Sequence, residues 1–189
     1  MPTLYARIPD DRIGVLIGPG GQTKREIARR TGASITIEEE GQVRVTSPDT
    51  EPEHAMIGRD VVLAIGRGFS PPRALRLTKE GTVLTILDIK FETGKRAKGA
   101  LRRIRSRLIG TDGRARARIE ELSGCSVSVY GATVALIGED AQMERATRAV
   151  ELLLRGSEHS TVFHLLARLR RNDVAAEALD SLDDDGLAG

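Results

Sequence analysis

Aromatic residues are scarce in this sequence. They make up 3% of its 189 residues, and tryptophan is absent. Proteins that read RNA bases by stacking them on a platform of Phe, Tyr or Trp need more of these side chains, which speaks against that class. Hydrophobic residues reach 40%, which is enough for packed cores built mainly from Ile, Val, Leu and Ala.

Cysteine and long apolar runs are scarce as well. The single cysteine, Cys125, excludes a disulfide within the chain and a zinc site built on several cysteines, and it favours a reducing compartment. No apolar run approaches the roughly 18 residues needed to span a membrane. The first residues do not form the apolar segment of a secretory signal. We therefore expect a cytoplasmic protein without a membrane partner, in which Cys125 is a buried small hydrophobe.

The residue patterns of common enzymes are missing too. The glycine-rich segment at residues 18–24 lacks the Gly-Lys-Ser/Thr ending of a phosphate-binding P-loop, and no Gly-x-Gly-x-x-Gly opens a βαβ unit. Neither paired carboxylates, a Ser/His/Asp set nor a group of metal ligands accompanies the glycines. We therefore expect no catalytic residues, no metal and no cofactor.

What the sequence does contain is an internal repeat with an offset of 92 residues. Leu-Ile-Gly at 16–18 recurs at 108–110, and the apolar positions that follow keep the same register. The other identical pairs are Gly21/Gly113, Ile27/Ile119, Gly32/Gly124 and Ser34/Ser126. A repeat of this length is typical of two copies of a small domain rather than of a solenoid.

Each copy predicts the element order β-α-α-β-β-α from its hydrophobic periodicity. In the first copy we expect strands at 3–8, 33–38 and 43–47 and helices at 11–17, 22–31 and 51–67. In the second we expect strands at 82–89, 125–129 and 132–137 and helices at 95–109, 114–123 and 140–154. Asp11 is a candidate N-cap, Gly32 ends a helix, and Glu40-Gly41 and Tyr130-Gly131 are hairpin turns.

These elements predict a domain organisation. The first domain covers 1–68, a linker covers 69–81, the second domain covers 82–155, and residues 156–189 hold a C-terminal helix and an acidic tail. In the linker, Ser70 and Pro71 can cap and start a short helix. The added helix is expected at 161–171. The tail carries six acids and no Lys or Arg, so we expect it to be frayed at its end.

Both copies place a Gly-x-x-Gly turn between two helices. The turns are Gly18-Pro19-Gly20-Gly21 and Gly110-Thr111-Asp112-Gly113. Glycine lets another backbone approach closely, and the N–H groups and positive dipole end of the following helix face the turn, so a phosphate can bind there. The strand after that helix would supply an apolar wall for bases, at Ile35 and Ile37 or at Val127 and Val129.

This pattern resembles the KH domain of type I, which binds about four nucleotides of single-stranded RNA. The fold class implied is α+β, with two tandem domains that each pack a three-stranded antiparallel sheet on three helices, followed by a C-terminal helix.

Charge separates the two copies. Residues 95–118 hold ten basic residues and one acid, whereas residues 11–32 hold five basic residues and two acids. Around the second turn the candidate phosphate ligands are Arg107, Arg114, Arg116 and Arg118; around the first they are Lys24 and Arg25. Because phosphate binding is largely electrostatic, the second copy should carry most of the RNA affinity.

Three features weaken individual contacts. Asp112 places a carboxylate in the second turn, Pro19 removes a donor from the first, and Glu38-Glu39-Glu40 would repel RNA beside the first copy. The first copy is therefore an auxiliary RNA site or a docking module.

A closer resemblance covers most of the chain up to about residue 171. The second copy's Arg-Leu-Ile-Gly-Thr-Asp-Gly-Arg and Val-Tyr-Gly segments, and the Ala-Ile-Gly-Arg-Gly-Phe-Ser-Pro junction at 64–71, look like the KH-domain pre-ribosomal RNA factors known as partners of the Nob endonuclease, archaeal members above all. The resemblance implies binding near the 3′ end of small-subunit ribosomal RNA during ribosome assembly, beside the Nob endonuclease. It also implies contact with the alpha subunit of translation initiation factor two.

Three alternatives stay open. A protein adaptor with weak RNA binding would use the same fold as a scaffold. A single-stranded DNA binder is compatible with the same groove. A nucleotide-binding enzyme is the third, although the motifs that it would need are missing.

Overall fold

The computed structural model describes residues 1–95 and 97–186, which group into two compact units. Unit 1 consists of residues 1–87 together with 128–137. Unit 2 consists of the described residues of 88–127 and of the segment from 138 onward.

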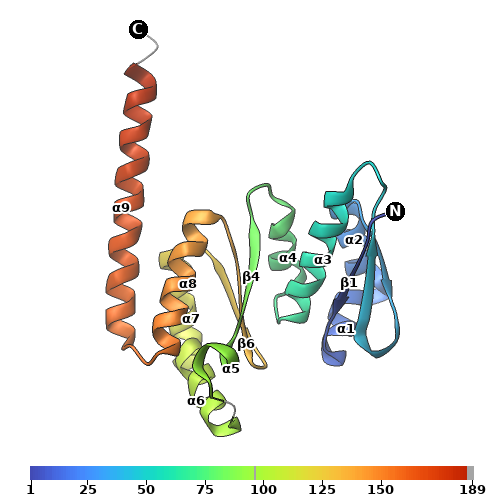
Figure 1. The fold of residues 1–189 in the computed structure, drawn as a ribbon, viewed down its shortest axis with the longest axis horizontal. Helices are drawn as coiled ribbons and strands as arrows, with labels where there is room; N and C mark the ends of the chain where they lie inside the picture. Colours follow the sequence, from blue (N-terminus) through green and yellow to red (C-terminus); the bar gives the residue numbers. More distant parts are fainter. Residues whose placement is uncertain (96, 187–189) are drawn as a thin grey trace. The chain divides into compact units, whose positions relative to one another are not determined.

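Unit 1 contains the first copy of the repeat, whose element order is the predicted β-α-α-β-β-α (Figure 1). Its elements are β1 (Thr3–Arg7), α1 (Asp10–Ile17), η1 (Pro19–Gly21), α2 (Gln22–Thr31), β2 (Ser34–Ile37), η2 (Glu39–Gly41), β3 (Gln42–Thr46) and α3 (Pro52–Gly66). After α3 the chain forms α4 (Pro71–Ala74), η3 (Leu75–Thr78) and β4 (Val83–Asp88).

The first sheet has the strand order β1-β3-β2 and is antiparallel throughout. Val45 on the central strand pairs with Leu4 on one side and Ile35 on the other. Because side chains alternate across a strand, one face of the sheet buries Val43, Val45 and Ile35 against the helices. The sequence alternation at 33–38 and 43–47 that predicted these strands is therefore explained by burial on one face.

The second copy repeats this order. Its elements are α5 (Ile89–Thr93), α6 (Lys98–Ile109), η4 (Thr111–Gly113), α7 (Arg114–Ser123), β5 (Ser126–Tyr130), β6 (Thr133–Gly138) and α8 (Asp140–Leu154). With β4 at its start, the copy forms a three-stranded sheet in the order β4-β6-β5. Two three-stranded sheets with helices confirm the predicted α+β class with two KH-type copies.

Several predicted boundaries are wrong by a few residues. Helix α1 begins at Asp10 after an N-cap at Pro9, so Asp11 is not the cap. Strand β4 ends at Asp88, whose carboxylate accepts hydrogen bonds from two backbone N–H groups and so caps the short helix α5. This helix was not predicted from the sequence. The second hairpin turns at Gly131-Ala132, one residue later than expected.

The end of the chain is more helical than predicted. Helix α9 runs from His159 to Gly186, so the acidic segment continues the helix that was expected to stop at 171. In Figure 1, α9 runs beside α7 and α8 of the same unit over its first part and continues past them. Arg145 of α8 pairs with Asp173, and Arg170 donates to the Glu121 carbonyl of α7 at 3.1 Å, which fixes α9 on both helices.

The hairpin of the second copy packs within unit 1 against the junction that follows α3. Ala135 and Ile137 belong to the hydrophobic core that contains Leu16, Ile27 and Ile65. The strand that carries them, β6, is buried at every position. Its apolar run is therefore buried on both faces.

Polar contacts hold the same hairpin in place. The Ser128 hydroxyl donates to the Arg67 carbonyl at 2.8 Å, and the Tyr130 hydroxyl donates to the Asp11 carboxylate. At Gly68, where φ is +95°, a Cβ atom would lie 2.7 Å from Ser128 Oγ, so only glycine fits. The Gly-Arg-Gly-Phe junction and the Val-Tyr-Gly hairpin, both singled out in the sequence, are thus parts of one contact.

The burial predicted for Cys125 is confirmed. Cys125 is buried, with 2% of its surface exposed. Among the helices that the structure describes, none combines the length and the apolar character needed to cross a membrane.

Candidate nucleic-acid interface

The two Gly-x-x-Gly turns have nearly the same backbone geometry. Gly18 and Gly110, the first residues, have φ/ψ of 69°/175° and 74°/176°. The third residues, Gly20 and Asp112, are left-handed at 55°/23° and 53°/27°. In each turn the last glycine donates its N–H to the carbonyl of the first, at 3.1 and 3.3 Å. The repeat in the sequence is thus a repeat in backbone conformation.

The first glycine of each turn is required by a close approach to the helix that follows. A Cβ atom at Gly110 would lie 2.7 Å from the backbone nitrogen of Ala115, and one at Gly18 would lie 2.9 Å from that of Thr23. The last glycine is less crowded, because a Cβ atom at Gly113 would meet only the Arg116 guanidinium at 4.0 Å. The turn therefore brings its own backbone, rather than side chains, against the N-terminus of the helix.

The N-termini of α2 and α7 carry no side-chain cap. Their N-cap residues are Gly21 and Gly113, both in the left-handed conformation, and neither offers a side chain to the first N–H groups. A helix N-terminus without a side-chain cap keeps donors and the positive dipole end available to an anion. The geometry fits a phosphate ligand at both turns.

The four arginines predicted around the second turn do not share one environment. Arg114 and Arg118 lie four residues apart on one face of α7; the Arg114 side chain is 81% exposed, and Arg118 donates to Glu121 at 2.7 Å. Arg116 lies on another face, and its buried Nε has no hydrogen-bond partner among the residues that the structure describes. Arg107 donates to the Ser157 carbonyl, so part of its guanidinium holds the α8–α9 connection.

Asp112 occupies the left-handed position that glycine fills in the first turn. Asp tolerates this conformation better than most residues. Its side chain is 77% exposed, and its carboxylate lies 3.8 Å from the Arg114 guanidinium. The acid in the loop is therefore turned to solvent and partly neutralised by its neighbour.

The residues expected to form apolar walls divide into two kinds. Ile35 and Val127 are buried, with 4% and 1% of their surface exposed, so they belong to the cores and offer little surface to a base. Ile37 and Val129 are half-buried and stand nearer the surface. Ile37 and Val129 therefore offer more surface to a base than Ile35 and Val127 do.

Around the first turn, more of the basic side chains already have hydrogen-bond partners than around the second. Arg25 folds back and donates to the Gly20 carbonyl at 2.9 Å, while Lys24 is half-buried. Glu26, at the position equivalent to Arg118, forms a two-pronged pair with Arg29 at 2.9 and 2.7 Å, and this hydrogen bonding lowers the pKa of the Glu26 carboxyl. Fewer cations are thus available to a phosphate here.

The acids beside the first copy are less repulsive than their sequence suggests. Glu38 pairs with Arg44 at 2.7 Å, and Glu40 lies 3.6 Å from Arg7. These pairs offset part of the negative charge of the loop.

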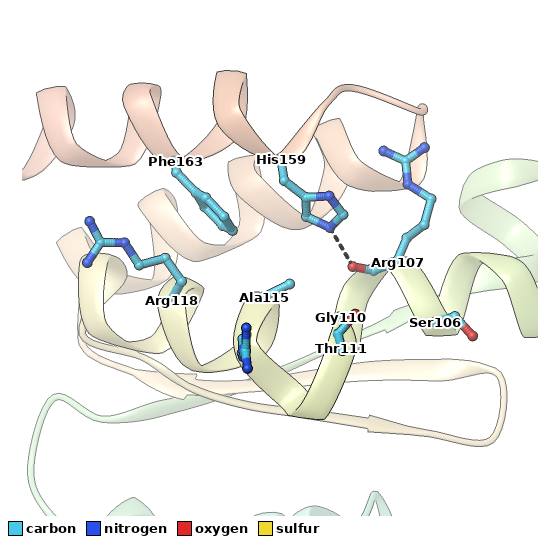
Figure 2. Close-up of a pocket in the computed structure, with 9 residues that line it drawn as sticks. Ser106, Arg107, Gly110, Thr111, Ala115, Arg118, His159 and Phe163 are labelled. Atoms are coloured by element: carbon cyan, nitrogen blue, oxygen red, sulfur yellow. Dashed lines mark hydrogen bonds between the residues drawn. The ribbon is translucent and has the colours of Figure 1, made fainter.

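A pocket of about 690 Å³ adjoins the second turn (Figure 2). One side is formed by the end of α6, the turn and the start of α7, and the other side by His159 and Phe163 of α9. Neither residue was predicted for the site, because His159 lies outside the helix expected at 161–171 and the packing of that helix against the second turn is not visible in the sequence. The available signal was their spacing of four, which places two ring side chains on one helix face. In the part of the chain that the structure describes, no group of His, Cys, Asp or Glu is arranged to hold a metal.

Comparisons with protein families agree with the fold. Residues 3–57 match the KH domain, and residues 83–171 match the eukaryotic type KH-domain, KH-domain type I. The protein is therefore a tandem KH protein, built from two modules of an RNA-binding class.

Individual similar proteins show which family of tandem KH proteins the chain belongs to. A KH domain-containing protein of Methanocaldococcus jannaschii is 41% identical over 167 residues, which cover 87% of this chain and 73% of that protein. Dim2p from Pyrococcus horikoshii OT3, known from a crystal structure, is 50% identical, with a TM-score of 0.83 and coverage of 89% of this chain and 99% of that one. A chain of the a/eIF2alpha-aDim2p-rRNA complex from the same organism is also 50% identical, with a TM-score of 0.84 over 90% and 94%. The chain belongs to the archaeal Dim2p family of KH-domain proteins, the family that its sequence resembles.

Proposed function

We propose that this protein binds single-stranded RNA in ribosome assembly, at a site near the 3′ end of small-subunit ribosomal RNA, and works there beside the Nob endonuclease. The observation that carries the proposal is the second turn, Gly110-Thr111-Asp112-Gly113, which opens onto the uncapped N-terminus of α7 beside Arg114. The crystallised complex of the Pyrococcus horikoshii protein contains ribosomal RNA, which supports the choice of RNA.

We assign the RNA contacts as follows. The backbone phosphates lie on the second turn and the start of α7, with Arg114, Arg116 and Arg118 as cations and Arg107 at the rim. Val129 forms the apolar wall on β5. In the first copy, Gly18, Pro19, Gly20 and Gly21 with Lys24, Arg25 and Ile37 form an auxiliary site. We keep 1–68 and 82–155 as the extents of the two KH domains.

Thr111→Asp tests the main site. The substitution adds a second acid beside Asp112 at an exposed position, so it should repel phosphate without disturbing a core. We expect the affinity for an RNA copy of the small-subunit 3′ end to fall at least about tenfold in moderate salt. Thr161→Asp, the same change at an exposed position of α9, is the matched control and should leave the affinity unchanged.

The outcome is measured by fluorescence anisotropy, with circular dichroism to show that both variants are folded. Equal affinities for wild type and Thr111→Asp would overturn the assignment of RNA to the second turn. A wild-type protein that prefers DNA of the same sequence would favour the single-stranded DNA alternative. Crosslinking in cell extract, followed by mapping of the bound RNA, tests the location at the 3′ end.

A second function, docking to a protein, is favoured by the first turn. Arg25 donates a hydrogen bond to the Gly20 carbonyl and Arg29 donates to Glu26, so both guanidinium groups are partly used and less available to a phosphate. The relative from Pyrococcus horikoshii was crystallised with the alpha subunit of initiation factor two, which makes this subunit a candidate partner. We expect Thr111→Asp to bind that subunit as wild type does; loss of both activities together would argue for a single shared site.

A further inference from the structure

The pocket beside the second turn combines an aromatic wall with a cationic lining. Its volume is about 690 Å³, within the range of sites that bind small molecules. Gly110, Thr111 and Ala115 form the wall on the side of the turn, and His159 and Phe163 form the wall on the side of α9. All of these residues belong to unit 2. The pocket is thus a defined site next to the phosphate-binding turn.

The α9 wall is aromatic and fixed in orientation. His159 and Phe163 have ring centroids 5.9 Å apart with planes tilted by 41°. A hydrogen bond of 2.7 Å joins His159 Nε2 to the Arg107 carbonyl at the end of α6. Figure 2 shows both rings pointing from α9 toward α6 and α7. Phe163 is only half-buried, so part of its ring is available to a planar ligand.

The remaining lining is cationic. Among the described residues that line the pocket, Arg107, Arg114 and Arg118 carry charge and none is acidic. The acids nearest to these arginines, Asp112 and Glu121, pair with Arg114 and Arg118 from outside the lining. An aromatic face bordered by guanidinium groups suits a ligand with a flat ring and an anionic backbone, which is the chemistry of a nucleotide.

We propose that this pocket binds one nucleotide of the RNA strand held by the second turn, with its base against Phe163 and its phosphate on the Arg114 guanidinium and the first backbone N–H groups of α7. The inference rests on the proposed function and extends it, because it adds an aromatic subsite to a protein poor in aromatics. The subsite is specific to the second copy. In the first copy the position of Arg118 is Glu26, and the corresponding final helix α3 leads to the short α4 rather than to an aromatic helix.

Phe163→Leu is the central test. Leucine keeps an apolar side chain of similar size for packing α9 but removes the ring. Anisotropy is measured on nested truncations of the small-subunit 3′-end RNA, shortened one nucleotide at a time from either end. We expect Phe163→Leu to lose about tenfold in affinity for RNAs that reach the pocket and nothing for RNAs confined to the turn. Phe163→Trp should bind as wild type, and Phe91→Leu, at a residue that is 85% exposed on α5, should be neutral.

The two proposals fail in different ways. If wild type binds none of these RNAs, the proposed function fails. If wild type binds and Thr111→Asp does not, but Phe163→Leu matches wild type at every length, the aromatic subsite is overturned. Thermal unfolding of each variant separates a lost contact from a displaced helix.

Photocrosslinking of the unmodified protein gives a second measurement. RNAs carrying 4-thiouridine at successive positions are crosslinked, and the protein is digested with trypsin. We expect one position to crosslink to the peptide at 156–168, which contains both His159 and Phe163. Crosslinks confined to the peptides of the turn, from every position of the label, would contradict the inference.

Discussion

The hydroxyl of Tyr130 donates a hydrogen bond to the carboxylate of Asp11, across 119 positions of the sequence. Arg12 makes a second contact with the same tyrosine: its guanidinium lies 5.8 Å from the centre of the Tyr130 ring and donates to the carbonyls of Ile65 and Phe69 at 2.8 Å. One tyrosine of the second hairpin is thereby joined to the start of α1 and to the end of α3.

Tyr130→Phe should lower the free energy of unfolding by about 1 kcal/mol, because it removes the hydrogen bond and keeps the ring. Urea unfolding measures the change. Tyr5→Phe is the matched control, since Tyr5 is the only other tyrosine and 54% of its surface is exposed. An equal effect of both substitutions would contradict a specific role for the contact with Asp11.

The same contact predicts a pH dependence. The hydrogen bond to Asp11, together with burial, raises the pKa of the Tyr130 hydroxyl above its ordinary value of 10.0. A raised pKa in the folded state means that the contribution to stability is complete below pH about 10 and is lost as the pH rises through the folded-state pKa. In the Tyr5→Phe protein, where Tyr130 is the sole tyrosine, ultraviolet titration should show ionisation above the midpoint of the unfolded chain. A midpoint at or below that of the unfolded chain would refute the link.

The two glycines of the second turn should respond differently to alanine. Both have positive φ, but Gly113 is left-handed, where alanine costs about 1–2 kcal/mol, whereas Gly110, with ψ of 176°, has a conformation that is essentially restricted to glycine. Only Gly110→Ala also drives a Cβ atom to 2.7 Å from the Ala115 backbone nitrogen, whereas a Cβ atom at Gly113 makes an ordinary contact with the Arg116 guanidinium at 4.0 Å. We expect a clearly larger loss of unfolding free energy for Gly110→Ala by chemical denaturation. Equal losses would show that the close approach is unimportant.

Periodicity and glycine placement predicted the repeated order of elements and both turns, because these features depend on residues that lie close together in the sequence. Contacts made by distant segments were not predictable in this way. His159 and Phe163 enter the site only because α9 folds back on α7, and Arg107 is partly occupied by the Ser157 carbonyl for the same reason. The uninterrupted apolar run at 134–137 did carry a signal of burial on both faces. We did not predict this burial, because the other strands alternate between apolar and polar residues.

Removing the carboxylate from the second turn should strengthen RNA binding. Asp112→Asn keeps a residue that tolerates φ of 53° and deletes one negative charge next to the proposed phosphate position. The expected gain in affinity is several-fold in low salt and shrinks as salt is added, because exposed charges are screened. Anisotropy at two ionic strengths measures it. Unchanged affinity at low salt would place the phosphate away from this turn.

The ion pair between Arg145 and Asp173 should control how firmly α9 is held. Arg145 is only 12% exposed in its side chain and also donates to the Ser123 carbonyl at 3.1 Å, so loss of Asp173 leaves a nearly buried cation with one partner fewer. Asp173→Asn should cost about 1 kcal/mol, discounted for the partial exposure of the carboxylate. It should also speed amide hydrogen exchange in the middle turns of α9, around residue 173. Glu144→Gln, at an exposed acid of α8, is the matched control and should leave exchange unchanged. If α9 exchanges at the same rate in both variants, its attachment depends on apolar packing by residues such as Val162 and Leu166 instead.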